Sequence, residues 1–230
     1  MRMIEFTKGY EEHDRLNPKL WDGIQLRPEV KVKLLQIAEK FREFIDIDVP
    51  VIDVQITGGQ VTYHYTEQSD LDLHLIIDYG KIQCDQEVEE LLDTKRLLFK
   101  EKFQINIRGI PVEPGTEDQT RPTVSSAWSL KTNSWIREPK NYSGKIDRKS
   151  IEKQYEYWDN LIRYVLNQND FEMAQKVLKL LRKYRKIGLK QTGEYGIENL
   201  VYKSLRNSKS LEKLVSYIDQ TFDKNLSINK

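Results

Sequence analysis

Hydrophobic and polar positions repeat with two different periods along the chain. Apolar residues recur every three or four positions over 28–45, which is the period of an amphipathic helix, and Pro28 suits its first turn. β-branched residues crowd 51–57, and leucines alternate with polar residues from position 71, as they do in strands. The pattern predicts a helix at 28–45, strands at 51–57 and 71–79, a helix at 85–102, and short strands at 103–108 and 110–113 separated by Gly109.

The second half of the chain has a different character. Prolines accumulate over 114–148, which predicts a loop-rich stretch that Trp128 and Trp135 pin onto a surface. Beyond it the pattern is helical, and Gly188 fits the position just after one helix end. Four helices are predicted, at 149–167, 170–187, 195–207 and 210–224. The expected fold class is therefore α+β, with an α/β domain at 1–145 and an α-helical domain at 146–230.

Composition narrows the class of protein. Hydrophobic residues make up 38% and charged residues 32% of the 230 positions, as is typical of soluble globular proteins. Cys84 is the only cysteine, so no disulfide forms within one chain and a reducing compartment is favoured. Neither an apolar run of membrane-spanning length nor a signal peptide is visible, so we expect a cytoplasmic protein without membrane contact.

Charge is distributed unevenly. The formal net charge is only +1, but from Gly144 onward 18 basic and 11 acidic residues give +7, which leaves −6 for the remainder. The acidic part suits cations and the basic part suits an anionic partner. The basic run includes Lys183 and Lys186 and contains no acid between 179 and 190. A solvated helix face explains such a run equally well as a site for a triphosphate or for a nucleic acid backbone.

Two aspartates share one face of a predicted strand. Asp70, Asp72 and His74 alternate with leucines, so the three polar side chains point to the side opposite the leucines. Neighbouring carboxylates repel each other unless water or a cation separates them, and Mg²⁺ prefers such oxygen ligands together with substrate phosphates. A strand that is half exposed to water is the simpler explanation of the same alternation.

A pair of glycines precedes the aspartates. Gly58 and Gly59 close the strand at 51–57, and residues 60–68 form a short helix or a loop before the next strand. Backbone N–H groups without side chains around them can bind a phosphate, although a glycine pair at a strand end is also a common turn. A strand, two glycines, a short spacer and an Asp-x-Asp strand are more specific together than either part alone.

This combination resembles the signature of the polymerase-β-like nucleotidyltransferase superfamily, an apolar residue, Gly, Gly or Ser, a spacer of about ten residues and Asp-apolar-Asp. The matching stretch is 52–113, with Gly58, Gly59, Asp70 and Asp72 at the signature positions. Glu113, in "INIRGIPVEP", is the candidate for the third carboxylate, although Pro114 is unusual inside a strand. The whole chain more loosely resembles uncharacterised nucleotidyltransferase-like proteins of bacteriophages, which would place it in the host cytoplasm.

The resemblance implies a reaction and a set of roles. Asp70, Asp72 and Glu113 would hold Mg²⁺ or Mn²⁺, and Gly58 and Gly59 would cradle the phosphates of a nucleoside triphosphate. A nucleotidyl group would move to a hydroxyl acceptor with release of pyrophosphate. An RNA or tRNA 3′ end is the favoured acceptor, while a protein, a small molecule and another nucleotide stay open. The alternatives are a catalytically inactive protein that binds a nucleotide or a partner, and an interaction protein with a coincidental acidic strand.

Overall fold

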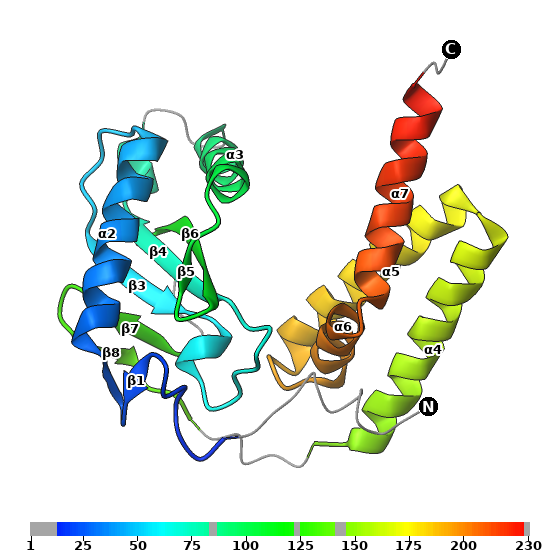
Figure 1. Ribbon diagram of the computed structural model, residues 1–230, viewed down its shortest axis with the longest axis horizontal. Helices are drawn as coiled ribbons and strands as arrows, with labels where there is room; N and C mark the ends of the chain where they lie inside the picture. Colours follow the sequence, from blue (N-terminus) through cyan, green and yellow to red (C-terminus); the bar gives the residue numbers. More distant parts are fainter. Residues whose placement is uncertain (1–12, 83–86, 122–124, 141–145, 228–230) are drawn as a thin grey trace. The chain divides into compact units, whose positions relative to one another are not determined.

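The computed structural model describes residues 13–82, 87–121, 125–140 and 146–227. Cys84 and the first two positions of the predicted helix at 85–102 lie outside these ranges. Two compact units divide the chain (Figure 1). Of the described residues, 13–140 belong to the sheet unit and 146–227 to the helical unit. Each unit has its own cluster of buried hydrophobic side chains.

A six-stranded mixed sheet forms the centre of the sheet unit. The single parallel pairing joins β4 to β6, while the remaining neighbours in this sheet are antiparallel. A separate two-stranded ribbon pairs β1 (Trp21–Asp22) with β2 (Gln25–Leu26). In spatial order, the large sheet consists of β5 (Asn106–Ile107), β6 (Ile110–Asp118), β4 (Leu71–Ile77), β3 (Asp53–Thr57), β7 (Ala127–Ser129) and β8 (Ser134–Arg137).

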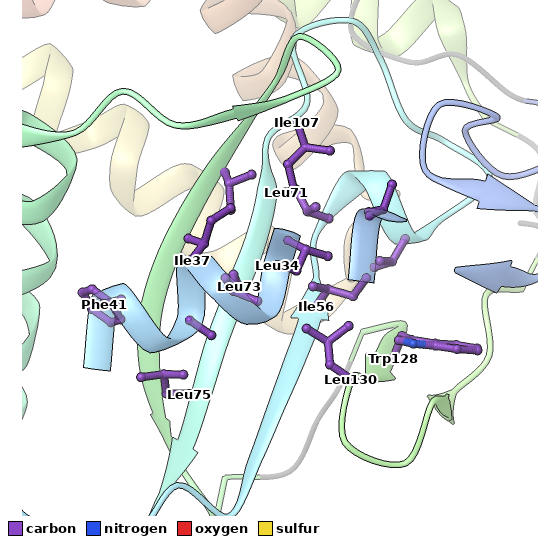
Figure 2. Packing of buried hydrophobic residues seen from close by; sticks show 14 of the residues in the cluster. Leu34, Ile37, Phe41, Ile56, Leu71, Leu73, Leu75, Ile107, Trp128 and Leu130 are labelled. Atoms are coloured by element: carbon purple, nitrogen blue, oxygen red, sulfur yellow. The ribbon is translucent and has the colours of Figure 1, made fainter. Parts of the chain in front are cut away.

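One face of the sheet is apolar and is covered by α2 (Pro28–Ile45). Figure 2 shows Leu34, Ile37 and Phe41 of this helix directed at the sheet, where Leu73 and Leu75 of β4 meet them. The helix therefore buries the stripe that its 3.6-residue period predicts. Its bounds match the predicted 28–45. The mixed sheet with its flanking helices confirms the α+β class.

The helix α3 (Glu87–Lys102) lies beside α2 and beside the strand β6. Phe99 anchors α3, because its ring contacts Phe41 and Phe44 of α2 edge-on at centroid distances of 5.1 and 5.3 Å. Aromatic rings in this arrangement gain favourable quadrupole contacts in addition to their burial. The opposite side of α3 carries mostly charged residues, and this side borders the candidate site described below.

The stretch 114–148 contains more regular structure than its prolines indicate. The prediction of loop here is wrong over 114–118, which continues β6, and over β7 and β8. Pro114 fits inside β6 because its backbone nitrogen needs no hydrogen-bond partner there. The N–H group of Val112 donates toward the β5 side, and the backbone nitrogen two residues later points the same way. The pairing with β5 covers only Ile110 and Pro111, so it does not reach position 114. No ladder hydrogen bond is lost at such an edge. The short strands β7 and β8 are too brief to show a clear alternation.

The two tryptophans of this stretch do pin it, as predicted. Trp128 is fully buried, and the ring of Trp135 stacks on that of Trp21 at a centroid distance of 4.8 Å. Trp128 meets both of the other rings edge-on. The Trp21 Nε1–H group donates to the carbonyl oxygen of Gln60 at 3.0 Å, which links this aromatic cluster to the turn after β3.

The helical unit consists of four helices around one apolar cluster. Side chains of Asp147 and Asp170 accept N-terminal hydrogen bonds from Ser150 N and Met173 N, which are standard caps. In the part of the chain that the structure describes, no helix is both long and apolar enough to cross a membrane. The helices are α4 (Arg148–Gln168), α5 (Phe171–Gln191), α6 (Ile197–Asn207) and α7 (Ser210–Leu226).

The prediction that Gly188 follows a helix end is wrong. The helix α5 continues to Gln191, and Gly188 lies buried within it. A Cβ atom at Gly188 would lie only 2.3 Å from Cβ of Glu198 in α6. Glycine is therefore required by the close approach of α5 and α6, and tertiary packing replaces the local explanation.

Candidate functional site

The glycine pair turns the chain directly beside Asp72. Gly58 follows the last residue of β3 and has φ = 85°, a backbone conformation that favours glycine. A Cβ atom at Gly58 would lie 2.2 Å from Oδ2 of Asp72, so the Asp72 carboxylate rests against the bare backbone. Gly59 then begins a single 3₁₀ turn, Gly59–Val61. The dihedral angle favours glycine at position 58, and any side chain there would displace the Asp72 carboxylate.

Strand pairing explains why these distant residues meet. The strands β3 and β4 run antiparallel with Thr57 opposite Asp72, so the end of β3 and the start of β4 coincide. Within β4, Leu71, Leu73 and Leu75 are buried, while Asp72 and His74 are half-buried on the other face. The alternation predicted from the sequence is thus present from position 71 onward.

Glu113 lies directly beside Asp72. In the parallel pairing of β4 and β6 the two residues are register partners. Neighbouring strands are about 4.8 Å apart, so the two carboxyl-bearing side chains emerge next to each other from the sheet. The Glu113 carboxylate accepts a hydrogen bond from the Lys100 ammonium group, which comes from the last turn of α3. A cation of the chain itself thus lies at this carboxylate.

A cleft of about 540 Å³ begins at these two carboxylates. It lies between the polar face of β4 and β6 and the charged side of α3. The Arg96 side chain of α3 lies against Gly115 of β6 inside the cleft, since a Cβ atom at Gly115 would lie 3.2 Å from Cδ of Arg96. The lining is strongly charged and consists of Asp72, His74, Tyr79, Glu89, Glu90, Leu92, Asp93, Thr94, Arg96, Leu97, Glu113, Pro114, Gly115, Thr116 and Arg121.

His74 also lines the cleft. Its described contact is with Glu117, and not with the carboxylate of Asp72 or Glu113. Its Nδ1 atom is 3.6 Å from Oε2 of Glu117. Burial lowers the pKa of His74, the nearby Arg96 lowers it further, and the charge of Glu117 opposes both effects. The lowered pKa favours the neutral imidazole at neutral pH. His74 therefore serves as a polar wall of the cleft rather than as a resident positive charge.

Gln60 holds the turn in place, and its role was not anticipated from the sequence. Its side chain is 1% exposed, accepts a hydrogen bond from Asn17 Nδ2 at 2.8 Å and donates to the carbonyl oxygen of Ser69 at 2.7 Å. One buried amide thus ties the turn after β3 to the approach of β4 and to an N-terminal segment. A glutamine after two glycines carries no recognisable signal, because its partners lie nine and 43 residues away.

The remaining predicted residues are placed as follows. Asp70 is half-buried one residue before β4 and is not among the residues that line the cleft. Gly59 faces Ser69, whose Oγ atom would lie 2.8 Å from a Cβ at Gly59. Lys183 and Lys186 belong to α5 in the helical unit. The structure thus brings together Gly58, Asp72 and Glu113 of the predicted set.

The donor chemistry fits a hard divalent cation only in part. Asp72 and Glu113 offer carboxylate oxygens, the ligands that Mg²⁺ and Mn²⁺ prefer. Among residues 13–82, 87–121, 125–140 and 146–227, no group of three or more His, Cys, Asp or Glu side chains is arranged to hold a metal ion. Mg²⁺ is commonly held by one or two carboxylates together with substrate phosphates, so two carboxylates suffice when a triphosphate completes the shell.

Comparisons of this chain with protein-family models, with curated proteins and with solved structures found no match. The functional argument therefore rests on the residues and the geometry described above.

Proposed function

We propose that the chain is a metal-dependent nucleotidyltransferase, which moves a nucleotidyl group from a nucleoside triphosphate to a hydroxyl acceptor. The observation that carries the proposal is that Gly58 lies against the Asp72 carboxylate, and that Asp72 and its register partner Glu113 line one cleft. A bare backbone turn suits phosphate oxygens, and adjacent carboxylates suit the cation that accompanies them. This juxtaposition depends on two strand pairings, of β3 with β4 and of β4 with β6.

Each residue has a role in the proposed reaction. The backbone N–H groups at Gly58 and Gly59 would bind the phosphates, and the carboxylates of Asp72 and Glu113 would hold Mg²⁺ or Mn²⁺ together with those phosphates. The bound ion would neutralise charge on the phosphates and activate the acceptor hydroxyl. Glu113 accepts the hydroxyl proton, the acceptor oxygen forms a bond to the α-phosphorus, and the bond to the β-phosphate oxygen breaks. Pyrophosphate leaves with the electron pair of that bond.

An inactive, nucleotide-binding protein is the second candidate function. It is favoured by the contact of Lys100 with Glu113, which already neutralises the third carboxylate. A lysine in this place can bind a triphosphate while it keeps a second ion away. The two candidates differ in outcome, because only the first one produces pyrophosphate.

The deciding experiment compares the unchanged protein with Asp72→Asn. Each α-labelled nucleoside triphosphate is supplied with Mg²⁺ or Mn²⁺ and with cellular RNA, and label transfer and pyrophosphate are measured. Binding of Mn²⁺ is measured in parallel with and without the triphosphate. Asp93→Asn is the matched control, since Asp93 lines the same cleft from α3 but is 65% exposed.

We expect transfer by the unchanged protein and by Asp93→Asn, and none by Asp72→Asn. We also expect Mn²⁺ binding that depends on the triphosphate and is weakened by Asp72→Asn. Triphosphate binding without any transfer would favour the inactive candidate. A folded protein that binds neither triphosphate nor Mn²⁺ would refute both.

A further inference from the structure

We infer that the outer face of the α4–α5 pair binds single-stranded nucleic acid, the class of acceptor favoured for the proposed transfer. The inference deepens the proposed function, but its test measures binding and is independent of catalysis. The surface, here called the tyrosine–lysine face, is made of Tyr157 and Tyr164 on α4 and of Lys176, Lys183 and Lys190 on α5.

Two large aromatic side chains on α4 are exposed to solvent. Tyr157 is 60% exposed and Tyr164 is 62% exposed, which is unusual for side chains of this size. The two residues are seven positions apart, so they lie on one side of the helix and about 10 Å apart along its axis. Exposed tyrosines in a row are platforms on which nucleobases stack, and every base has a suitable face.

A row of cations runs along α5. Lys176, Lys183 and Lys190 follow one another at the same seven-residue interval and are exposed. No acidic residue occurs in α5 after Glu172, which lies 3.8 Å from Lys176 at the beginning of the row. Lysines along a groove neutralise successive phosphates of a bound strand.

Aromatic ring contacts join α4 to α5 next to both rows. The Tyr157 ring meets the Trp158 ring edge-on at 5.5 Å, and Trp158 in turn contacts Tyr184 of α5 at 5.5 Å. Tyr184 directly follows Lys183, and the exposed Leu180 and Ile187 lie one turn on either side of it. Tyr157 and Lys183 are each the direct chain neighbour of a ring in this α4–α5 contact, so both rows flank it.

The acidic residues of α4 point away from this face. Glu152, Glu156 and Asp159 recur at helical spacing on a different side of the helix from Tyr157 and Tyr164. Asp159 is buried and accepts a hydrogen bond from Ser210 of α7, which fixes the direction of that side. The tyrosine–lysine face thus combines exposed rings with cations, and this combination fits a flexible polyanion with free bases better than a second copy of the same basic face.

The test uses the full chain and a fluorescein-labelled oligoadenylate of about 12 nucleotides, with binding followed by fluorescence anisotropy. Tyr157→Ala with Tyr164→Ala is compared with the same positions changed to Phe. We expect the alanine pair to weaken binding at least about tenfold and the phenylalanine pair to preserve it, because stacking uses the ring. A duplex RNA of equal length should bind more weakly than the single strand.

Lysine variants test the electrostatic part. Lys176→Gln with Lys183→Gln should lower the slope of log affinity against log salt concentration by about 1.4, since each lost phosphate contact removes about 0.7 for single strands. The matched control is Phe222→Ala with Lys224→Gln, which removes a 52% exposed ring and a cation from α7. This control should bind like the unchanged protein.

Several results would overturn the inference. They are an absence of oligonucleotide binding, equal affinity for duplex and single strand, or unchanged binding by the tyrosine-to-alanine pair. Asp72→Asn separates this inference from the proposed function. Binding that persists in Asp72→Asn while transfer is lost supports both, whereas absent binding in a protein that still transfers nucleotides to another acceptor refutes only the inference.

Discussion

At the scale of single residues, the candidate site depends on two close contacts, one at Gly58 and one at Glu113. The Asp72 carboxylate fills the space in which position 58 would carry a side chain, and the Lys100 ammonium group forms an ion pair with the Glu113 carboxylate. The first relation fixes Asp72 in place, while the second sets the charge that an incoming cation meets. Substitutions at these positions should therefore affect function through geometry and charge separately.

Gly58→Ala should abolish nucleotidyl transfer, because the new methyl group displaces the Asp72 carboxylate. Gly109→Ala is the matched control, since Gly109 also has a positive φ of 81° but has no atom within 4 Å of its missing Cβ. Both variants should lose about 1 kcal/mol of unfolding free energy through the strained backbone. Chemical denaturation and the transfer assay together check this, and equal activity of the two variants would contradict it.

Lys100→Gln should increase the apparent affinity for Mg²⁺ in the presence of triphosphate by about 1.4-fold to fivefold. Removing one exposed ion pair changes the free energy by about 0.2–1 kcal/mol, and the lost ammonium group no longer competes for Glu113. Lys102→Gln serves as the control, because Lys102 lies over the ring of Phe103 instead. Titration calorimetry with Mg²⁺ measures the effect, and a lower affinity in Lys100→Gln would show that this lysine assists binding.

At the scale of elements, long periodic segments were predictable and short or tightly packed ones were not. The helix at 28–45 was predicted to the residue because its apolar stripe repeats over five turns. The strands β7 and β8 were missed because three or four residues cannot display a period. Gly188 was misread as a helix end, since a glycine after a basic run looks the same whether it ends a helix or admits a neighbouring one.

Gly188→Ala should destabilise the protein by about 1–3 kcal/mol. Intrinsic helix propensity alone predicts the opposite, a gain of about 1 kcal/mol. Contact with Cβ of Glu198 decides the sign, because the backbones of α5 and α6 must separate to admit the methyl group. Lys190→Ala, at an exposed position of the same helix, is the control. Urea denaturation measures both, and a stabilised Gly188→Ala would refute the packing explanation.

The candidate site shows the same division. Gly58 and Asp72 were named from a glycine turn followed by an acidic strand, whereas Glu113 was named from the family resemblance, which implies a third carboxylate on a later strand. Gln60 and Lys100 were not, because their significance depends on contacts with Ser69 and Glu113 that only the fold creates. A sequence reports which groups are suited to a reaction more readily than it reports what holds or neutralises them.

At the scale of the whole molecule, the chain carries two separate hydrophobic clusters. One is built around α2 and the sheet, and the other joins α4 to α7. Units with their own cores can unfold independently, so a single free energy of unfolding need not describe the protein. The division also separates the candidate transfer site from the tyrosine–lysine face, since each is contained in one unit.

Leu34→Ala and Leu181→Ala should therefore destabilise different transitions. Both side chains are fully buried, Leu34 in the sheet unit and Leu181 in the helical unit. Each truncation should cost about 2–5 kcal/mol in its own unit. Calorimetry should show two transitions, each shifted by only one of the variants. A single transition shifted equally by both would mean that the units unfold together.

The bond between Gln60 and Ser69 has a consequence for how this molecule can diversify. It closes the chain between β3 and β4 at its base, while the strand register sets Gly58 beside Asp72 independently of what lies between. Glu67 and Gln68 are the exposed positions of that loop. Doubling the length of a closed loop costs only about 0.6 kcal/mol. Insertions there would cost little free energy and would leave Gly58 beside Asp72, so this loop is where the chain can lengthen without disturbing the candidate site.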